Sequence, residues 1–240
     1  MRSTRYLPLL ALTTHAFDLN VLLAAIDEYF PDNIALKTAD KIISKAESAI
    51  GKLIGVQETR SDLVDDSCGD VMVIFARGTG EPGNIGALVA PAFYDELVSA
   101  MDGKTVSMQG VNSSAYPAVV ADYFTGGSES GAEAMASYVN QSLVSCPDVP
   151  IVMSGWSQGA QVVHKAAELV GPEIMGSMSS VITFGDPVSS SSIDGIDTSK
   201  VLVICHEGDD VCDFGDFLGP LHFTYAKDTP EAASFVASHL

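Results

Sequence analysis

A serine between two glycines is the first pattern in this sequence that indicates chemistry. In the stretch VMSGWSQGAQVV, residues 152–163, Ser157 lies between Gly155 and Gly159, with β-branched residues before it and a helix-forming run after it. A strand, a tight turn and a helix in this order make a nucleophile elbow, in which residues without bulk leave room for the strained turn and the helix N-terminus favours developing negative charge. With 21 glycines in the chain the bare pattern is unspecific, so this context is what predicts that Ser157 is a nucleophile.

A serine hydroxyl needs a base to remove its proton and an acid to orient that base. The sequence has five histidines, and elbow enzymes bring their partners in the chain order serine, acid, histidine. His222, in the loop sequence FLGPLHFTY, fits this order and is the predicted base. The other histidines lie in the N-terminal leader, on the elbow helix, before the candidate acid and at the chain end: His15, His164, His206 and His239.

The acid is expected at a strand end between Ser157 and His222. The stretch CHEGDDVCDFGD, residues 205–216, offers a group of carboxylates there, namely Asp209, Asp210, Asp213 and Asp216. The first two lie between Cys205 and Cys212, whose pairing would hold a carboxylate still, but the residues alone do not separate these neighbours. Asp186 is a further carboxylate, for which the following Pro187 favours a role in a turn.

The tetrahedral intermediate of acyl transfer needs hydrogen-bond donors, and one is expected to be the backbone N–H of Gln158, directly after the nucleophile. The second is expected from the glycine-rich loop FARGTGEPGNIG, residues 75–86, in which Thr79 offers an N–H and a hydroxyl. This loop lacks the lysine of a phosphate-binding loop. Beside the predicted base, we expect an apolar wall for the acyl chain, made of Leu218, Leu221 and Phe223.

Short β-branched runs alternate with helical stretches over most of the chain. Runs of this kind, joined by crossovers this long, predict an α/β fold with a central parallel five-stranded sheet sandwiched by helices, placed at residues 61–240. The runs are residues 71–75, 105–111, 150–153, 179–184 and 200–204, and the helical stretches are residues 91–101, 131–145 and 158–170.

The N-terminal part has a different character. Residues 1–16 combine two arginines, a short apolar run and small residues, which is typical of a secretory signal peptide. Residues 17–60 contain two amphipathic helical stretches, 18–30 and 38–54, which need an apolar surface to cover. We weigh two interpretations of residues 17–60: a pro-segment or permanently docked helix pair, and a lid over a hydrophobic active site. The apolar positions are Leu19, Leu22, Leu23, Ile26, Tyr29 and Phe30 in the first stretch, and Ile42, Ile43, Ala46, Ile50 and Leu53 in the second.

Composition narrows the class of partner. The net charge of −19 would repel nucleic acids and anionic membrane surfaces, and after the leader no apolar run approaches the roughly 20 residues of a membrane span. We therefore expect a secreted, extracellular monomer.

The four cysteines favour disulfides in a secreted chain. Three pairings are possible; the short spacing favours Cys205 with Cys212, which leaves Cys68 with Cys146. Asn112 and Asn140 begin glycosylation sequons.

Together these motifs resemble the fungal cutinases, secreted serine esterases with an α/β-hydrolase-like fold, over about residues 66–236. The resemblance is carried by CGDVMVIFARGTGEPGNIG, GWSQGA, CHEGDDVC and PLHFTYA. The Cys-x3-Asp-x2-Cys pattern of the third motif implies Asp209 as the acid, and the fourth supports His222. Thr79 stands where the family usually has serine, Trp156 stands where it commonly has tyrosine, and the N-terminal helical pair is a departure from many members.

The resemblance implies a two-step acyl transfer through Ser157, His222 and Asp209, with the N–H groups of Thr79 and Gln158 as the oxyanion hole and with no metal or cofactor. The implied substrates are cutin, a polyester of hydroxy fatty acids, and short-to-medium acyl esters at an apolar interface. Two alternatives stay open: an acetylxylan esterase of the same fold, and a secreted protein without catalytic activity that binds apolar surfaces.

Overall fold

The computed structural model describes residues 18–30 and 34–240, except the side chains of residues 38–43. The expected signal peptide, residues 1–16, and the side chains at the predicted apolar positions Ile42 and Ile43 lie outside the described part. Most of the described chain folds around a five-stranded sheet of parallel strands in the order β3-β2-β4-β5-β6. The strands are β2 (Val71–Ala76), β3 (Val106–Gly110), β4 (Ile151–Trp156), β5 (Ser180–Phe184) and β6 (Val201–Ile204). The predicted fold class is confirmed.

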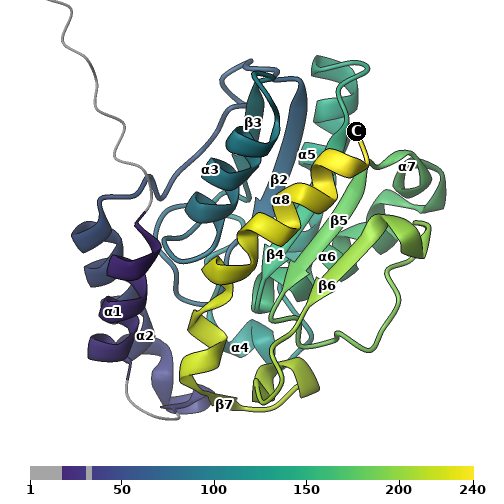
Figure 1. Ribbon diagram of the computed structural model, residues 1–240. Coiled ribbons are helices and arrows are strands. Elements are labelled where there is room, and N and C mark those ends of the chain that lie inside the picture. The colour runs from purple at the N-terminus through teal and green to yellow at the C-terminus, as the bar shows by residue number, and fades with distance from the viewer. Residues whose placement is uncertain (1–17, 31–33) are drawn as a thin grey trace, which may run out of the picture.

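Helices cover both faces of this sheet because its central strands are apolar on both sides. Along β2, Val71, Val73 and Phe75 belong to one buried apolar cluster, whereas Met72 and Ile74 belong to the other. In Figure 1, α3 and α8 lie across the near face and α5 and α6 lie behind the sheet. The helices of these layers are α3 (Ala90–Ala100), α5 (Glu129–Ser145), α6 (Gln158–Val170) and α8 (Thr229–Ser238), with the shorter α4 (Val120–Tyr123) and α7 (Pro172–Ser177) beside them.

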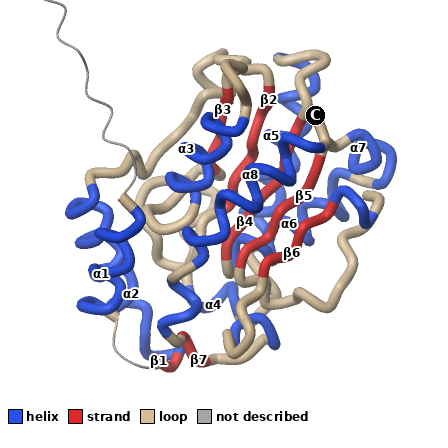
Figure 2. Tube along the Cα trace, viewed as in Figure 1, coloured by secondary structure: helices blue, strands red, loops and turns tan. Residues whose placement is uncertain are grey.

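The N-terminal segment forms two helices, α1 (Leu19–Tyr29) and α2 (Leu36–Ile54), which lie side by side at one flank of the molecule (Figures 1 and 2). Their apolar positions join the same cluster as the near face of the sheet, with Leu22, Ile26 and Ile50 at most 1% exposed. Two of the expected apolar positions differ: the side chains of Tyr29 and Leu53 are 41% and 58% exposed, because each turns away from the face that the helix buries.

A second, two-stranded sheet ties this segment to the rest of the protein. Strand β1 (Ile34–Ala35) pairs in antiparallel fashion with β7 (Phe217–Leu218), and the backbone N–H of Leu36 donates to Asp216 O over 2.8 Å. Strand β7 comes just before His222 in the chain. The link therefore connects the N-terminal helices directly to the loop of the predicted base.

The structure contains two disulfides, Cys68–Cys146 and Cys205–Cys212, which are the pairs that the sequence favours. The first joins the start of β2 to the end of α5, and the second follows β6. Within residues 18–30 and 34–240, every helix is too short or too polar to cross a lipid bilayer.

Candidate active site

Ser157 occupies the turn between β4 and α6, and its backbone is in an unusual conformation. Its φ of 57° and ψ of −125° lie in a region that side-chain-bearing residues rarely adopt. Two glycines permit the turn: a Cβ atom on Gly155 would lie 2.3 Å from Gly159 O, and one on Gly159 would lie 2.0 Å from Ala76 O. The backbone N–H of Ser157 donates to Phe184 O on β5 over 2.9 Å, so the neighbouring strand holds the bend in place. The strand–turn–helix geometry expected of the GWSQG sequence is therefore present.

His222 lies on the 3₁₀ turn Pro220–Phe223 and reaches both of its predicted partners. Its Nε2 is 2.9 Å from Ser157 Oγ and its Nδ1 is 2.8 Å from Asp209 Oδ2. An ionised carboxylate only accepts hydrogen bonds, so Nδ1 carries the proton that is donated to Asp209, and Nε2 is left to accept from the serine hydroxyl. The ring of His222 also stacks on Trp156, with 5.4 Å between the ring centres. The three side chains thus form one continuous hydrogen-bonded chain from carboxylate to hydroxyl.

The environment of Asp209 keeps its carboxyl ionised. Burial by itself would raise its pKa, but the hydrogen bond and charge of His222, the O–H of Tyr225 and the backbone N–H of Val211 outweigh burial and hold the pKa below its ordinary value. The donor–acceptor distances from Tyr225 and Val211 are 2.7 and 3.2 Å. Asp209 is therefore charged and fixed in direction throughout the neutral range.

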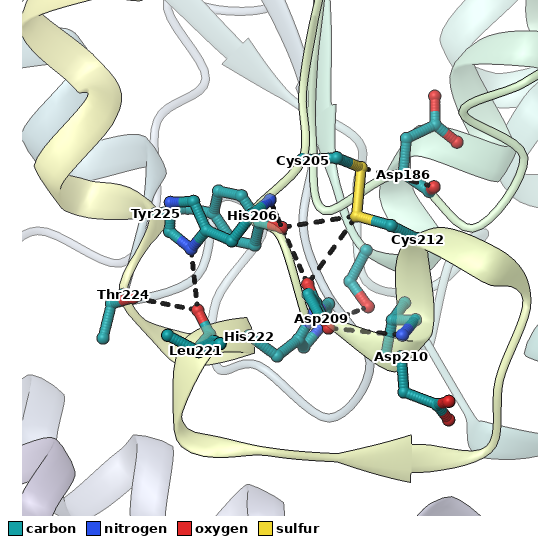
Figure 3. A network of polar contacts seen from close by, with 12 residues as sticks. Asp186, Cys205, His206, Asp209, Asp210, Cys212, Leu221, His222, Thr224 and Tyr225 are labelled. Atoms are coloured by element: carbon teal, nitrogen blue, oxygen red, sulfur yellow. Dashed lines mark hydrogen bonds and ion pairs between the residues drawn. A yellow bond between two sulfur atoms is a disulfide. The ribbon is translucent and has the colours of Figure 1, made fainter.

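Tyr225 and His206 support this carboxylate, and the sequence reasoning missed both roles. Tyr225 is fully buried, and its hydroxyl accepts from the backbone N–H of His206 while donating to Asp209. The His206 ring stacks on Tyr225 at 4.1 Å, and its Nε2 lies 2.7 Å from Asp228 Oδ2. In Figure 3 this group lies beside the Cys205–Cys212 disulfide. The tyrosine in PLHFTYA was the available signal, three residues after the predicted base.

The expected oxyanion donors lie at the same place. Gln158 is the first residue of α6, where backbone N–H groups have no partner inside the helix. Thr79 is 6% exposed and lines the same small cavity as Ser157 and His222. Two loops from neighbouring strands, β2 and β4, thus place Thr79 and Gln158 near Ser157.

The loop carrying Thr79 is held from inside by Glu81. Its buried carboxylate accepts from the backbone N–H groups of Gly78, Ala87 and Leu88 over 2.9 to 3.0 Å. Burial raises the pKa of Glu81 to about 7 in spite of these donors and of the nearby Arg77 charge. Arg77 in turn donates from Nε to Glu81 O over 2.8 Å. These contacts fix the backbone on both sides of Thr79.

The site is closed in this structure. Ser157 and His222 are 5% and 1% exposed, and they border a cavity of about 10 Å³, against the roughly 300–1,000 Å³ of protein pockets that hold small molecules. Part of the closure comes from the N-terminal helices: Leu36 and Glu47 line the cavity, and Phe30 stacks on Phe223 with ring centres 3.7 Å apart.

The predicted apolar wall divides into two groups. Leu218 and Phe223 are buried and line the cavity. Leu221 is 44% exposed and does not line it, because it lies on the outer side of the 3₁₀ turn. Its contact with a substrate stays a prediction.

The remaining candidate carboxylates have other partners. Asp210 Oδ2 accepts from the backbone N–H of Phe217, which supports the start of β7. Asp186, which is buried, pairs with the partly exposed His164 over 2.9 Å and accepts from the backbone N–H of Val188, as its expected turn role requires. Asp213 is on the 3₁₀ turn after Asp209, and Asp216 pairs through its backbone with Leu36. No three His, Cys, Asp or Glu side chains of the described residues converge to hold a metal ion.

Comparison with known proteins gives independent evidence of the family that this chain resembles. The family model described as Cutinase matches residues 67–240. A cutinase from Hypocrea jecorina is 40% identical over 218 residues, which cover 91% of this chain and 85% of that protein. The solved structure of Trichoderma reesei cutinase in complex with a C11Y4 phosphonate inhibitor has a TM-score of 0.78 and 41% identity, covering 85% of this chain and 90% of that one. An acetylxylan esterase structure, 20% identical with a TM-score of 0.53 over 72% of this chain and 99% of its own, shares the fold.

Proposed function

Because this chain belongs to the cutinase family of serine ester hydrolases, we propose that it hydrolyses the ester bonds of cutin and of short-to-medium acyl esters through a triad of Ser157, His222 and Asp209. The observation that supports the triad is the unbroken chain of hydrogen bonds from Asp209 Oδ2 through both ring nitrogens of His222 to Ser157 Oγ. Its order and lengths are those that a serine nucleophile and its base require.

The reaction proceeds in two steps. His222 Nε2 takes the proton of Ser157 as Oγ attacks the ester carbonyl carbon, and Asp209 stabilises the imidazolium that forms. The tetrahedral oxyanion accepts hydrogen bonds from the backbone N–H groups of Thr79 and Gln158. The imidazolium then protonates the leaving alcohol and leaves an acyl-enzyme. Water attacks the acyl-enzyme by the same route and releases the acid, which restores Ser157.

Covalent labelling tests the nucleophile. An organophosphate is expected to add one phosphoryl group to the native protein in detergent micelles, and the Ser157→Ala variant is expected to stay unlabelled. Mass spectrometry of each intact protein measures whether the mass of the label has been added. A native protein without label would favour the alternative of a protein that binds apolar surfaces without catalysis.

The substrate class is tested by comparing two products. Hydroxy fatty acids released from purified cutin are expected to exceed acetate released from acetylated xylan under the same conditions. The apolar lining supplied by Leu218 and Phe223 supports the cutin assignment, since an acyl chain buries apolar surface that an acetyl group lacks. The reverse order of rates would favour an acetylxylan esterase.

Residues 17–60 are proposed to be a lid rather than a pro-segment. The support is that Leu36 and Glu47 line the cavity of the proposed triad, and that Phe30 stacks on Phe223, which lines it as well. Hydrolysis of a small soluble ester is expected to rise when detergent micelles are added, and to lose this response when residues 17–60 are removed. Equal rates with and without micelles would contradict a lid.

Secretion as a monomer is also proposed, with residues 1–16 as the signal peptide. The two disulfides support an extracellular location. The N-terminal sequence of protein purified from culture medium is expected to begin after Ala16, and sedimentation is expected to give the mass of one chain. Retention inside the cell or a dimer would contradict the corresponding assignment.

A further inference from the structure

One ionisable group of the N-terminal helices lies in the active-site cavity. Glu47, on α2, has no exposed surface, and it borders the same cavity as Ser157, His222 and Thr79. Neither of its carboxylate oxygens has a hydrogen-bond partner among the described residues. An ionised carboxylate buried without partners is costly, so the closed structure requires the neutral, protonated side chain.

The charged groups around Glu47 do not remove this cost. From the loop after β2, Glu81 repels it and Arg77 attracts it, but no hydrogen bond joins Arg77 to Glu47, whose two oxygens have no partner among the described residues. Burial, followed by the charge of Glu81, raises the pKa of Glu47 well above its ordinary value of 4.5, against the lowering effect of Arg77. From the turn after β7, His222 faces the same cavity and is engaged with Asp209.

Among the described residues, the helices packed against α2 add more acids and no compensating cation at the cavity. On α4, Asp122 is half-buried. On α1, the charged residues Asp27 and Glu28 are exposed to solvent.

We propose that Glu47 is a proton-operated latch of the lid: its neutral form holds α1 and α2 closed over Ser157, and its ionisation opens them. This inference rests on the proposed lid. Opening places the carboxylate in water, where it is stable as an anion, and the proton is released to solvent.

The direction of the pH effect follows from the two states of the lid. In the open state the carboxyl has its ordinary pKa, and in the closed state its pKa is raised. Closure is therefore fully favoured below the open-state value and weakens as the pH rises toward the closed-state value. Between the two values, each pH unit lowers the ratio of closed to open protein about tenfold.

The protein contains its own probe for this equilibrium. Trp156 is the single tryptophan of the chain, is 1% exposed and lines the cavity beside Glu47. Quenching of its fluorescence by acrylamide measures how often the cavity is open, and it does not depend on turnover. The full mature chain is measured from pH 4.5 to pH 8 without detergent.

The wild type is expected to show a quenching constant that rises at least about threefold over this range. Glu47→Gln, which keeps the shape of the side chain but cannot ionise, is expected to give a low, flat profile. Glu47→Met is the second variant, with an apolar group of similar length, and is expected to be flat as well. Glu28→Gln, a matched change at an exposed acid of the same lid, is expected to follow the wild type. His222, which stacks on Trp156, is unchanged in every variant, so a difference between the profiles reports on Glu47.

A flat wild-type profile, or a rise that both Glu47 variants retain, would overturn the latch. Micelles added at pH 5 distinguish this failure from a failure of the lid. Strong quenching of Trp156 in micelles together with a flat pH profile leaves the lid in place and removes only the latch. Weak quenching in micelles removes the lid and the latch with it, whereas labelling of Ser157 tests the esterase separately.

Discussion

The contact between Phe30 and Phe223 offers the sharpest test of how the active site is covered. Phe30 ends α1, is 4% exposed and stacks on Phe223 at 3.7 Å with an interplanar angle of 13°. Truncating a buried phenylalanine to alanine costs about 3–5 kcal/mol. In Phe30→Ala, most of this loss falls on the closed state, because opening the lid separates the two rings in any case.

Taking about 3 kcal/mol, the equilibrium constant for opening rises about 100-fold in Phe30→Ala. The assay is hydrolysis of p-nitrophenyl butyrate with and without detergent micelles, expressed as the ratio of the two rates. The wild type is expected to depend strongly on micelles, and the variant is expected to be nearly as active without them. Its rate in micelles is expected to match the wild type, because the triad is unchanged.

Tyr29→Ala is the matched control, since this neighbouring aromatic side chain is 41% exposed. It is expected to keep the wild-type ratio, and thermal unfolding of both variants checks that the sheet domain is intact. A Phe30→Ala enzyme that folds and still needs micelles as the wild type does would refute the reasoning.

Three further results are expected. Asp209→Asn should lower kcat in micelles by roughly 10⁴-fold, because the imidazolium loses its counter-charge and the ring its orientation; a loss below tenfold would speak against the acid assignment. The pKa of Asp209 is lowered in the folded protein, so the ionised carboxylate stabilises the fold above the ordinary pKa of about 4, and this stabilisation is lost as the pH falls through the lowered pKa. Below pH 4, the melting temperatures of Asp209→Asn and Tyr225→Phe should therefore fall less steeply with pH than that of the wild type. Calorimetric curves that run parallel for all three proteins would contradict this. Replacing both Cys68 and Cys146 by serine should lower the free energy of unfolding by about 4 kcal/mol in guanidinium titrations. The hydrolysis rate in micelles at 25 °C should stay unchanged, since this disulfide joins the start of β2 to the end of α5. A folded variant that has lost its hydrolysis rate would contradict this prediction.

The parts of the fold that local sequence predicts are those with a strong short-range pattern. The fully buried strands β2 and β4 read as β-branched runs, and α6 begins at Gln158 as the elbow sequence indicates. The nucleophile follows from its strand–turn–helix context, and the base follows from chain order. Among the acids, the residues alone left four neighbours open, and only the cysteine spacing shared with a family selects Asp209. The catalytic role of Asp209 and the supporting roles of the residues around it remain predictions, which the experiments above test.

The contacts that the sequence left open join residues far apart in the chain. The amphipathic pattern of residues 18–30 indicates that something apolar is covered, but nothing local says that Phe30 meets Phe223 or that Ile34 pairs with Leu218. Glu47 has a polar side chain on a helix, for which solvent exposure is the ordinary expectation. Its burial depends on the position of α2 against the loop that carries Thr79, which is set by the whole tertiary structure.

The apolar core that the proposed lid shares with the sheet has a further consequence. Leu22, Ile26 and Ile50 belong to one apolar cluster with Phe93 on α3, so the proposed lid is also a structural layer of the enzyme. Opening of the proposed lid would expose two complementary apolar surfaces, one on the N-terminal helices and one on the rest of the protein. The same exposed apolar surfaces would then cause both the adsorption of the open enzyme to a hydrophobic solid and its aggregation in water without detergent. An enzyme engineered to stay open would gain the first property only together with the second.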